Sequence, residues 1–332
     1  MLETFAVGLS SIANTACLIS IIGGVFIGII FGAVPGLSAT MALALFLPIT
    51  YSMDSVTAVV LLTSLYVGGI SGGLISAILT GIPGTPSSVA TCFDGWPMTQ
   101  KGQGVKALGV GVVASFGGSI FSTIILIFAA PALAAIAIRF GNYEYFAIAL
   151  FSLSMMCGLS GDNLWKGLLS GLMGCMFATV GLDAIGAVKR FTFGSRLVQS
   201  GFQTLPVLIG LFAVAEIISR IASARTTKPE PPVDVNMKGI KGFGFSLKEA
   251  GAQLKNFLMC SAIGTAIGIL PGIGGGAANV MAYGVSKSTS KHPENYGKGD
   301  PGGVVATESS NNAAVGGALV PLLSVVPCAV GT

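Results

Sequence analysis

The first apolar run of the chain contains a stretch whose residue types could bind a solute. Residues 4–53 include no Asp, Glu, Lys or Arg, yet the centre of the run reads FGAVPGLSAT, with Pro35 and Gly36 followed by the hydroxyls of Ser38 and Thr40. Proline and glycine interrupt a membrane helix and leave backbone N–H groups free at the break. Free N–H groups, the positive ends of helix dipoles and small polar side chains can together surround a solute.

Two further stretches have the same character. GIPGTPSS, residues 81–88, cannot form a regular helix and still lies in an uncharged run. ILPGIGGG, residues 269–276, resembles the first stretch. Together with Gly36, Ser38 and Thr40, the candidate binding residues are Gly84, Thr85, Ser87, Ser88, Gly272, Gly274 and Asn279. For Ser38 and Thr40, a hydroxyl bonded back to its own helix is an equally good interpretation.

Glu308, in ATESSNNAA, is the candidate for ion coupling. A carboxylate flanked by apolar helix is costly and usually functional. With Asn311 and Asn312 it offers oxygen ligands for Na⁺, or a protonatable group for H⁺. The alternative is an interfacial residue, because Glu308 lies only eight positions beyond Asp300.

The composition indicates which elements must position these residues. Hydrophobic residues make up 52% of the 332 and charged residues only 9%, whereas a soluble domain carries roughly 25% charge. The many charge-free runs indicate a polytopic integral membrane protein, and the absence of strand alternation indicates helices rather than a barrel. We therefore expect an all-α fold that includes broken or re-entrant helices.

Enzyme chemistry is poorly supported by the sequence. The single histidine, His292, lies in a polar loop, and the six cysteines occur singly, so we expect no metal site, no catalytic residues and no cofactor beyond Na⁺ as a coupling ion. GKGDPG, residues 297–302, has the Gly-x-Gly-x-x-Gly pattern but opens no βαβ unit, so we interpret it as a loop. We expect no nucleic-acid partner.

The charged residues divide the chain into three parts. Residues 1–219 hold the first repeat unit and additional spans, residues 220–255 form a polar linker rich in Pro, Gly and Lys, and residues 256–332 begin a second unit. A short surface helix is predicted near SLKEAGAQLKN in the linker. Carboxylates at the ends of spans are expected to be solvated, namely Asp54, Asp94, Glu144, Asp162 and Asp183.

The second unit repeats motifs of the first. Gly268 and Pro271 follow Gly32 and Pro35 by 236 residues, and GGALVPLL at 316 follows GGLISAIL at 72 by 244. Two matches in the same order indicate an internal duplication.

The distribution of basic residues predicts the orientation of these units. With the linker in the cytoplasm, 13 of the 17 Lys and Arg residues lie inside, and those outside are Arg139, Lys189, Arg190 and Arg196. The two copies then have opposite orientations, an inverted repeat typical of secondary transporters. The cluster at 189–196 fits this topology poorly and suggests a misplaced span.

Three quoted stretches identify a family resemblance. GIIFGAVPGLSATMALALFLPITY, GGISGGLISAILTGIPGTPSSVATCFDGWPM and ESSNNAAVGGALVPLL resemble the large membrane subunit of bacterial tripartite tricarboxylate transporters along essentially the whole chain. The resemblance implies import of tricarboxylates or other organic acids through the inner membrane, driven by an ion gradient. It also implies two partners, a small four-helix membrane subunit and a periplasmic substrate-binding protein.

The resemblance leaves several matters open. The broken segments contain no Lys or Arg, so the organic anion must bind through backbone N–H groups, helix N-termini and hydroxyls. The family continues well beyond the second copy, so the ending VVPCAVGT predicts a truncated chain. A channel, a membrane enzyme and a non-functional fragment of the carrier are the alternatives, and neither the substrate nor the choice of Na⁺ or H⁺ follows from the sequence.

Overall fold

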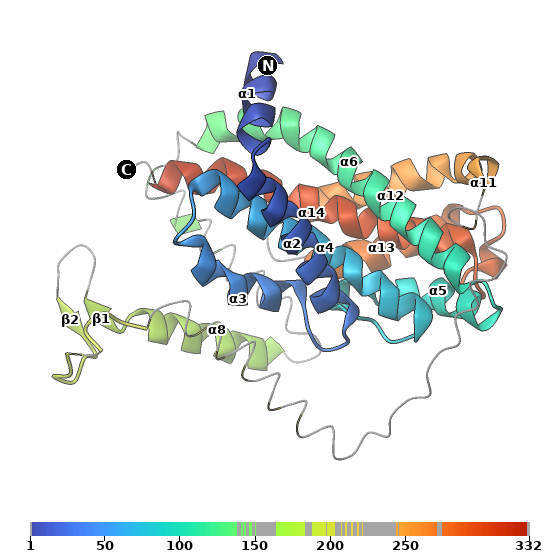
Figure 1. Ribbon diagram of the computed structural model, residues 1–332. Coiled ribbons are helices and arrows are strands. Elements are labelled where there is room, and N and C mark those ends of the chain that lie inside the picture. The colour runs from blue at the N-terminus through green and yellow to red at the C-terminus, as the bar shows by residue number, and fades with distance from the viewer. Residues whose placement is uncertain are drawn as a thin grey trace. The chain divides into compact units, whose positions relative to one another are not determined.

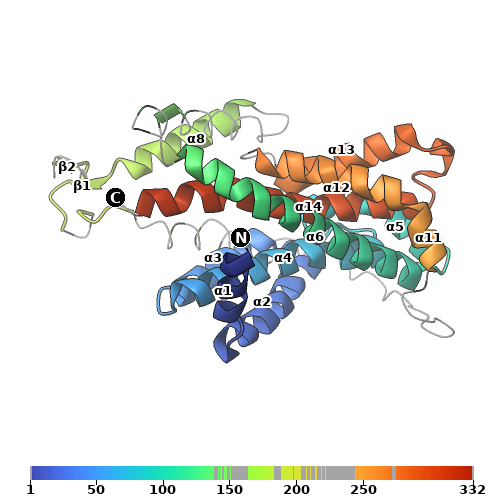
Figure 2. The same ribbon diagram turned by 90° about the horizontal axis from the view of Figure 1, so that it is seen from above.

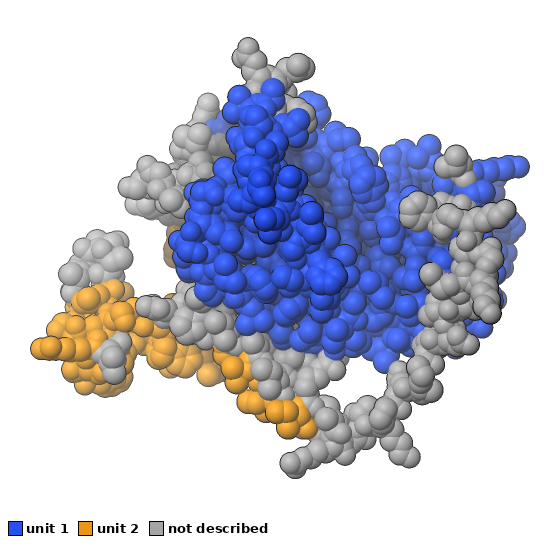
Figure 3. Space-filling model, viewed as in Figure 1, with its two compact units in different colours: residues 1–138, 227–332 blue, residues 139–226 orange. Residues whose placement is uncertain are grey.

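The structure is a computed structural model of the chain. It describes residues 2–137, 164–182, 188–196, 198–202, 246–270 and 274–330, together with isolated positions between 141 and 244. The chain divides into two compact units, residues 1–138 with 227–332 and residues 139–226 (Figure 3). Each unit is described by itself.

The first unit is a bundle of helices. Its described elements are α1 (Leu2–Ile12), α2 (Thr15–Ala33), α3 (Ala39–Thr50), α4 (Ser55–Leu79), the 3-10 turn η1 (Pro86–Ser88), α5 (Thr91–Gln100), α6 (Gly104–Ala137), α11 (Leu247–Ala252), α12 (Leu254–Ile269), α13 (Gly274–Thr289), the 3-10 turn η3 (Pro293–Asn295) and α14 (Pro301–Val330). Figures 1 and 2 show α2 beside α4, and α14 between α6 and α12. Segments from both sides of the polar linker therefore form one bundle.

Three described helices are long and apolar enough to cross a membrane. They are Thr15–Ala33, Ser55–Leu79 and Gly104–Ala132, and α3 and α12 are shorter apolar helices. Large aliphatic and aromatic side chains such as Ile22, Phe26 and Phe116 are exposed on this unit, as expected of helices whose outer face meets lipid. The helical membrane fold predicted from composition therefore agrees with the structure.

Glycines allow α2 to pack directly on the backbone of α4. A Cβ placed on Gly32 would lie 2.1 Å from the carbonyl oxygen of Gly69, and one on Gly28 would lie 2.4 Å from that of Leu65. Small residues at a spacing of four lie on one face of a helix and permit this close approach. The glycines of FGAVPG and of the preceding turns therefore hold the broken helix against its neighbour.

α12 packs on α14 in the same way. A Cβ on Gly264 would lie 2.2 Å from the carbonyl oxygen of Ser310, and one on Gly268 would lie 2.3 Å from that of Ala314. Gly268 is the residue that the sequence comparison pairs with Gly32. The order helix, break, helix, long helix thus occurs twice, as α2, α3, α4 and as α12, α13, α14.

Both breaks have local causes. α2 ends at Ala33 because Val34 is extended, and α3 starts after Ser38, whose Oγ accepts a hydrogen bond from the N–H of Met41. α12 ends at Ile269 with Leu270 extended, and α13 begins at Gly274, whose φ of 71° suits glycine.

A buried carboxylate fixes the loop that leads into α14. Asp94 is 1% exposed, and its Oδ1 accepts hydrogen bonds from the N–H groups of Gly297, Gly299 and Asp300 at 2.8–2.9 Å. The hydroxyl of Tyr283 donates to its Oδ2 at 3.0 Å. The expectation that Asp94 is solvated was therefore wrong, because backbone donors more than 200 residues away replace its water.

The other span-end carboxylates have mixed outcomes. Asp54 is exposed and accepts a hydrogen bond from the N–H of Thr57, which caps α4. Glu144, Asp162 and Asp183 lie outside the described residues. The loop interpretation of residues 297–302 is confirmed for 297–300, whereas Pro301 and Gly302 already belong to α14.

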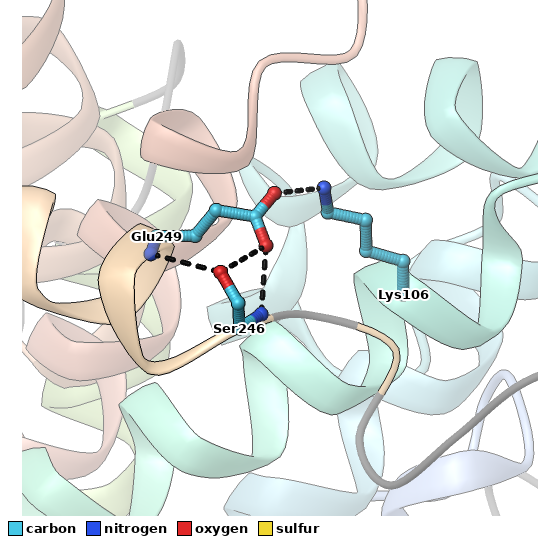
Figure 4. Close-up of polar contacts among 3 residues, drawn as sticks. All are labelled: Lys106, Ser246 and Glu249. Atoms are coloured by element: carbon cyan, nitrogen blue, oxygen red, sulfur yellow. Dashed lines mark hydrogen bonds and ion pairs between the residues drawn. The ribbon is translucent and has the colours of Figure 1, made fainter.

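The short helix predicted in the linker is present as α11. The Oγ of Ser246 accepts from the N–H of Glu249, and the Glu249 carboxylate accepts in return from the N–H of Ser246, a capping box. Glu249 also pairs with Nζ of Lys106 on α6 (Figure 4). These contacts, with the Lys106 hydrogen bond foremost, lower the pKa of Glu249 to about 2.

The second unit contains α8 (Leu164–Ala178) and a small hairpin. Strands β1 (Gly181–Leu182) and β2 (Lys189–Arg190) pair antiparallel, with Gly181 opposite Arg190 and Leu182 opposite Lys189. This hairpin is the one departure from the all-α expectation among the residues that the structure describes. Lys189 and Arg190, which fitted the predicted topology poorly, are exposed on it.

Candidate functional site

The loop from residue 80 to 90 contacts both broken helices. A Cβ placed on Gly84 would lie 2.1 Å from the carbonyl oxygen of Gly32, at the end of α2. On the other side, a Cβ on Gly275 would lie 3.3 Å from Cβ of Ser87, and one on Gly276 would lie 3.3 Å from the carbonyl oxygen of Pro86. The end of α2, the GIPGTPSS loop and the start of α13 therefore meet at one place.

Hydroxyl groups of the loop bond largely to the loop itself. Thr85 Oγ1 lies 3.0 Å from Ser87 Oγ, the N–H of Thr85 donates to Ser88 Oγ, and that hydroxyl donates to the carbonyl of Thr85. All three side chains are buried. Their mutual hydrogen bonds fix the backbone of the loop, which includes the 3-10 turn η1.

Glu308 is fully buried in α14. Its Oε1 accepts a hydrogen bond from Thr91 Oγ1 on α5 at 2.6 Å, and its Oε2 accepts from Ser115 Oγ on α6 at 2.9 Å. The side chain has no exposed surface, so Glu308 is buried inside the bundle. Its described hydrogen-bond partners are hydroxyls, which can donate to a carboxylate or direct an oxygen toward a cation.

Asn279 of α13 is connected to Glu308 through Thr91. Its Nδ2 donates to the carbonyl of Thr307 at 3.1 Å and to Thr91 Oγ1 at 3.4 Å, while its Oδ1 accepts from the N–H of Ala90 at 3.0 Å. The amide thereby ties α13 to the segment that follows the GIPGTPSS loop. A movement of α13 would disturb the hydroxyl that contacts Glu308.

Asn311 and Asn312 differ in their hydrogen bonds. Asn312 Nδ2 donates to Ser71 Oγ at 2.7 Å and to Ser119 Oγ at 3.3 Å. Asn311 is also fully buried, yet among the described residues neither its Oδ1 nor its Nδ2 has a hydrogen-bond partner. A buried polar group without a partner costs roughly 1–3 kcal/mol, so Asn311 is the most unusual polar group of the site.

The candidate residues of the first break have a local role. Ser38 caps α3, Thr40 is exposed, and Gly36 is exposed with a φ of 90°. The Ser38 hydroxyl therefore accepts a hydrogen bond as a helix cap and is not bonded back within a helix.

The structure therefore groups the predicted residues unevenly. Around α13 and α14 it gathers Ser87, Ser88, Gly274, Asn279, Glu308, Asn311 and Asn312, whereas Gly84 and Thr85 lie against α2 and α4. It does not bring Ser38 or Thr40 into hydrogen-bond contact with them, and Gly272 lies outside the described residues.

Four hydroxyl residues of the site were not predicted, namely Ser71, Thr91, Ser115 and Ser119. Each contacts Glu308, Asn279 or Asn312 across the bundle. Serines and threonines are common in apolar helices, where they usually bond to their own backbone, so a single sequence gave no signal for them.

A separate apolar groove of about 360 Å³ lies between α6, α11 and α12. Lys106 and Glu249 are at its edge, and its walls include Val110, Phe116 and Phe257. The groove contains none of the predicted site residues.

Comparison with known proteins identifies the family. The chain matches the tripartite tricarboxylate transporter TctA family over residues 18–327. It is 34% identical over 301 residues to an uncharacterized 52.8 kDa protein in the TAR-I ttuC' 3' region of Agrobacterium vitis, covering 91% of this chain and 59% of that protein. It is 43% identical over 61 residues to an uncharacterized protein in the TAR-II ttuC' 3' region of the same organism, covering 18% of this chain and 25% of that protein.

A helical membrane bundle with broken helices thus coincides with a match along nearly the whole chain. The chain belongs to the tripartite tricarboxylate transporter TctA family, a family of transporter components rather than enzymes, which confirms the resemblance found in the sequence. The chain spans less than two thirds of the length of the curated relatives it matches. No solved structure matches it.

Proposed function

We propose that this chain is the large membrane subunit of a binding-protein-dependent secondary transporter that imports tricarboxylates or related organic acids. Its location is the bacterial inner membrane, its driving force is a Na⁺ or H⁺ gradient, and its partners are a small four-helix membrane subunit and a periplasmic substrate-binding protein. Membership of the family supports this proposal.

The observation that carries the proposal is the meeting of the two broken helices at the GIPGTPSS loop. Gly84 lies against the end of α2, while Ser87 lies against the start of α13. Broken helices that meet in this way supply free N–H groups and helix ends to a transported solute. A channel would also use such loops, but nothing in the described site favours it.

The residues around this meeting point could bind an organic anion without a lysine or arginine side chain. Among the described residues of the site, none is Lys or Arg. A carboxylate would bind there through backbone N–H groups at a helix N-terminus and through hydroxyl or amide donors. These contacts are weaker than those of a bidentate arginine, so the carboxylate is released more easily. Weak, convergent contacts are suited to transport, because the solute must be released on the other side.

Uptake into proteoliposomes tests the proposal. The full-length protein, reconstituted with both partner subunits, is expected to accumulate radiolabelled citrate or another organic acid when a Na⁺ or pH gradient is imposed. Omission of the binding protein should abolish accumulation. Accumulation of no organic acid under any gradient would contradict the proposed function, and gradient-independent flux without the binding protein would support a channel instead.

Glu308 is the proposed coupling residue. It is buried among hydroxyl groups, and it is linked through Thr91 to Asn279 on α13, next to the proposed solute site. Binding of a cation or a proton at Glu308 would change the hydrogen bonds of Thr91 and Asn279. Through them it would bias the position of α13, which is how an ion and a solute can be coupled.

We further propose that the two repeats, α2–α4 and α12–α14, are inverted across the membrane with the linker in the cytoplasm. The bias of basic residues supports this orientation. Ser246 and His292 are exposed, so a cysteine at either position should resist impermeant thiol reagents in intact cells and react after permeabilisation. Reaction in intact cells would refute the orientation.

A further inference from the structure

Asn311 presents an unsatisfied amide at the start of α13. The side chain is fully buried, and neither of its polar atoms has a hydrogen-bond partner among the described residues. A Cβ placed on Gly275 would lie only 2.8 Å from Asn311 Oδ1. The amide of α14 therefore lies against the first turn of α13.

The start of α13 is itself a donor site. The first N–H groups of a helix have no partner within it, and the helix dipole places partial positive charge there. α13 has 16 residues, so its dipole is well developed, and Gly274 turns the chain into it with a φ of 71°. Helix N-termini of this kind bind carboxylate and phosphate groups.

The residues beside Asn311 at this corner have a small side chain or none. Gly275 has no side chain between the helix start and Asn311, and Ser87 of the loop lies on the other side, 3.3 Å from the position of a Cβ on Gly275. Because neither atom of the Asn311 amide makes a hydrogen bond, the amide can turn its Nδ2 toward this corner without losing one.

We infer that Asn311 and the first N–H groups of α13 bind one carboxylate group of the transported organic acid, an inference that rests on the proposed function. The sign of the local charge decides between an anion and a cation. The positive end of α13 attracts a carboxylate and repels Na⁺, so Asn311 belongs to the solute site rather than to the ion site for which the sequence suggested it. Glu308, one turn earlier on α14, bonds to Thr91 and Ser115 instead.

The first test replaces the amide by an apolar side chain of similar size. In the full-length protein in lipid nanodiscs, Asn311→Leu should weaken equilibrium binding of radiolabelled citrate roughly ten- to hundred-fold, as expected for the loss of a hydrogen bond to a charged group. Its melting temperature without citrate should not fall, because Leu removes a buried group that has no partner. Wild-type affinity in this variant would overturn the inference.

The second test fills the corner and keeps the Asn311 amide. Gly275→Ala places a methyl group 2.8 Å from Asn311 Oδ1 and 3.3 Å from Ser87 Cβ, and should weaken citrate binding roughly ten-fold or more, as expected when a ligand group loses its hydrogen bond to charge. Gly284→Ala is the matched control on the same helix, since a Cβ there meets nothing within 4 Å. Equal citrate affinity in the two variants would count against the subsite, even if Asn311→Leu failed to fold.

The remaining outcomes separate this inference from the proposed function. If the wild-type protein neither binds nor takes up any organic acid, the proposed function fails and the subsite with it. If the wild type transports citrate while both site variants keep its affinity, the subsite alone fails. If Asn311→Leu raises the Na⁺ requirement and leaves citrate binding unchanged, Asn311 is a cation ligand and the inference is wrong.

Discussion

The two broken helices of the bundle share an order of elements but differ in what they expose at the break. At the first break, between α2 and α3, Ser38 is occupied in capping α3 and Thr40 is exposed. At the second, between α12 and α13, Gly275 at the start of α13 lies against the amide of Asn311, which has no hydrogen-bond partner among the described residues. The first break thus leads into a capped helix, whereas the second brings a glycine of α13 beside a buried amide of α14.

The long helices that follow the breaks differ in a similar way. The offset of 244 residues pairs Glu308 of α14 with Ser64 of α4. Both are buried, but only Glu308 is ionisable. The residues proposed for solute and ion binding therefore lie mostly in the second repeat, α12–α14, and we infer that the first repeat, α2–α4, serves mainly as the packing surface for the GIPGTPSS loop.

The largest expected effect separates Glu308 from Ser64. Glu308→Gln keeps the shape and one acceptor oxygen but removes the charge, so ion-driven accumulation in proteoliposomes should be lost or its ion requirement raised sharply. Ser64→Ala, the matched control in the first repeat, should retain uptake. Glu308→Gln should specifically lose the Na⁺ dependence of uptake if the coupling ion is Na⁺, or the pH dependence of uptake if it is H⁺. Wild-type dependence on both ions in Glu308→Gln would remove Glu308 from coupling.

The next largest effect is the loss of stability when the close glycine contacts of α2 and α12 are disturbed, and the two repeats should respond alike. Gly32→Ala and Gly268→Ala each place a Cβ within 2.1–2.3 Å of a carbonyl oxygen on the neighbouring helix. Each should lower the free energy of unfolding by roughly 1–3 kcal/mol, the usual cost of overpacking, measured by thermal melting in detergent. Gly23→Ala on α2 is the control, since its Cβ meets nothing within 4 Å. An effect of Gly32→Ala no larger than that of Gly23→Ala would show that the described packing is wrong.

A smaller effect distinguishes the hydroxyls of the first break from those of the loop. Ser38→Ala removes a helix cap and should cost about 1 kcal/mol of stability without changing the KM for uptake. Ser87→Ala, beside the start of α13, should instead raise KM, with membrane insertion unchanged. The assignment would be reversed if Ser38→Ala raised KM while Ser87→Ala did not.

The smallest effect concerns the ion pair between Glu249 of α11, which precedes the second repeat, and Lys106 of α6. Contacts with Lys106 and Ser246 lower the pKa of Glu249 from 4.5 to about 2, so the carboxylate contributes stability above pH 4.5 that is lost as the pH falls through 2. Because the group is exposed, the contribution is small. Glu249→Gln should flatten the pH dependence of the melting temperature between these values, and an unchanged profile would mean that the ion pair does not form in solution.

Several elements were predictable because their causes are local. The breaks at Pro35 and after residue 269 follow from residues that end helices, and α11 follows from the Ser-x-x-Glu pattern of its capping box. The interruption at GIPGTPSS also followed from residue types, whereas for Glu308 the sequence left an interfacial position open. Asp94 was misjudged because its partners are backbone N–H groups at residues 297–300, which no local pattern connects to it.

The sequence by itself determined a helical membrane protein with interrupted helices, a repeated order of motifs and a family, because composition, helix breakers and motif spacing are properties of neighbouring residues. Only the tertiary structure decided which polar groups act together. Ser71, Thr91, Ser115 and Ser119 join the site from separate helices, and Asn311 differs from Asn312 solely in what lies opposite each amide. Hydrogen bonds across a bundle depend on how helices pack, and that packing is set by close glycine contacts between segments far apart in the chain.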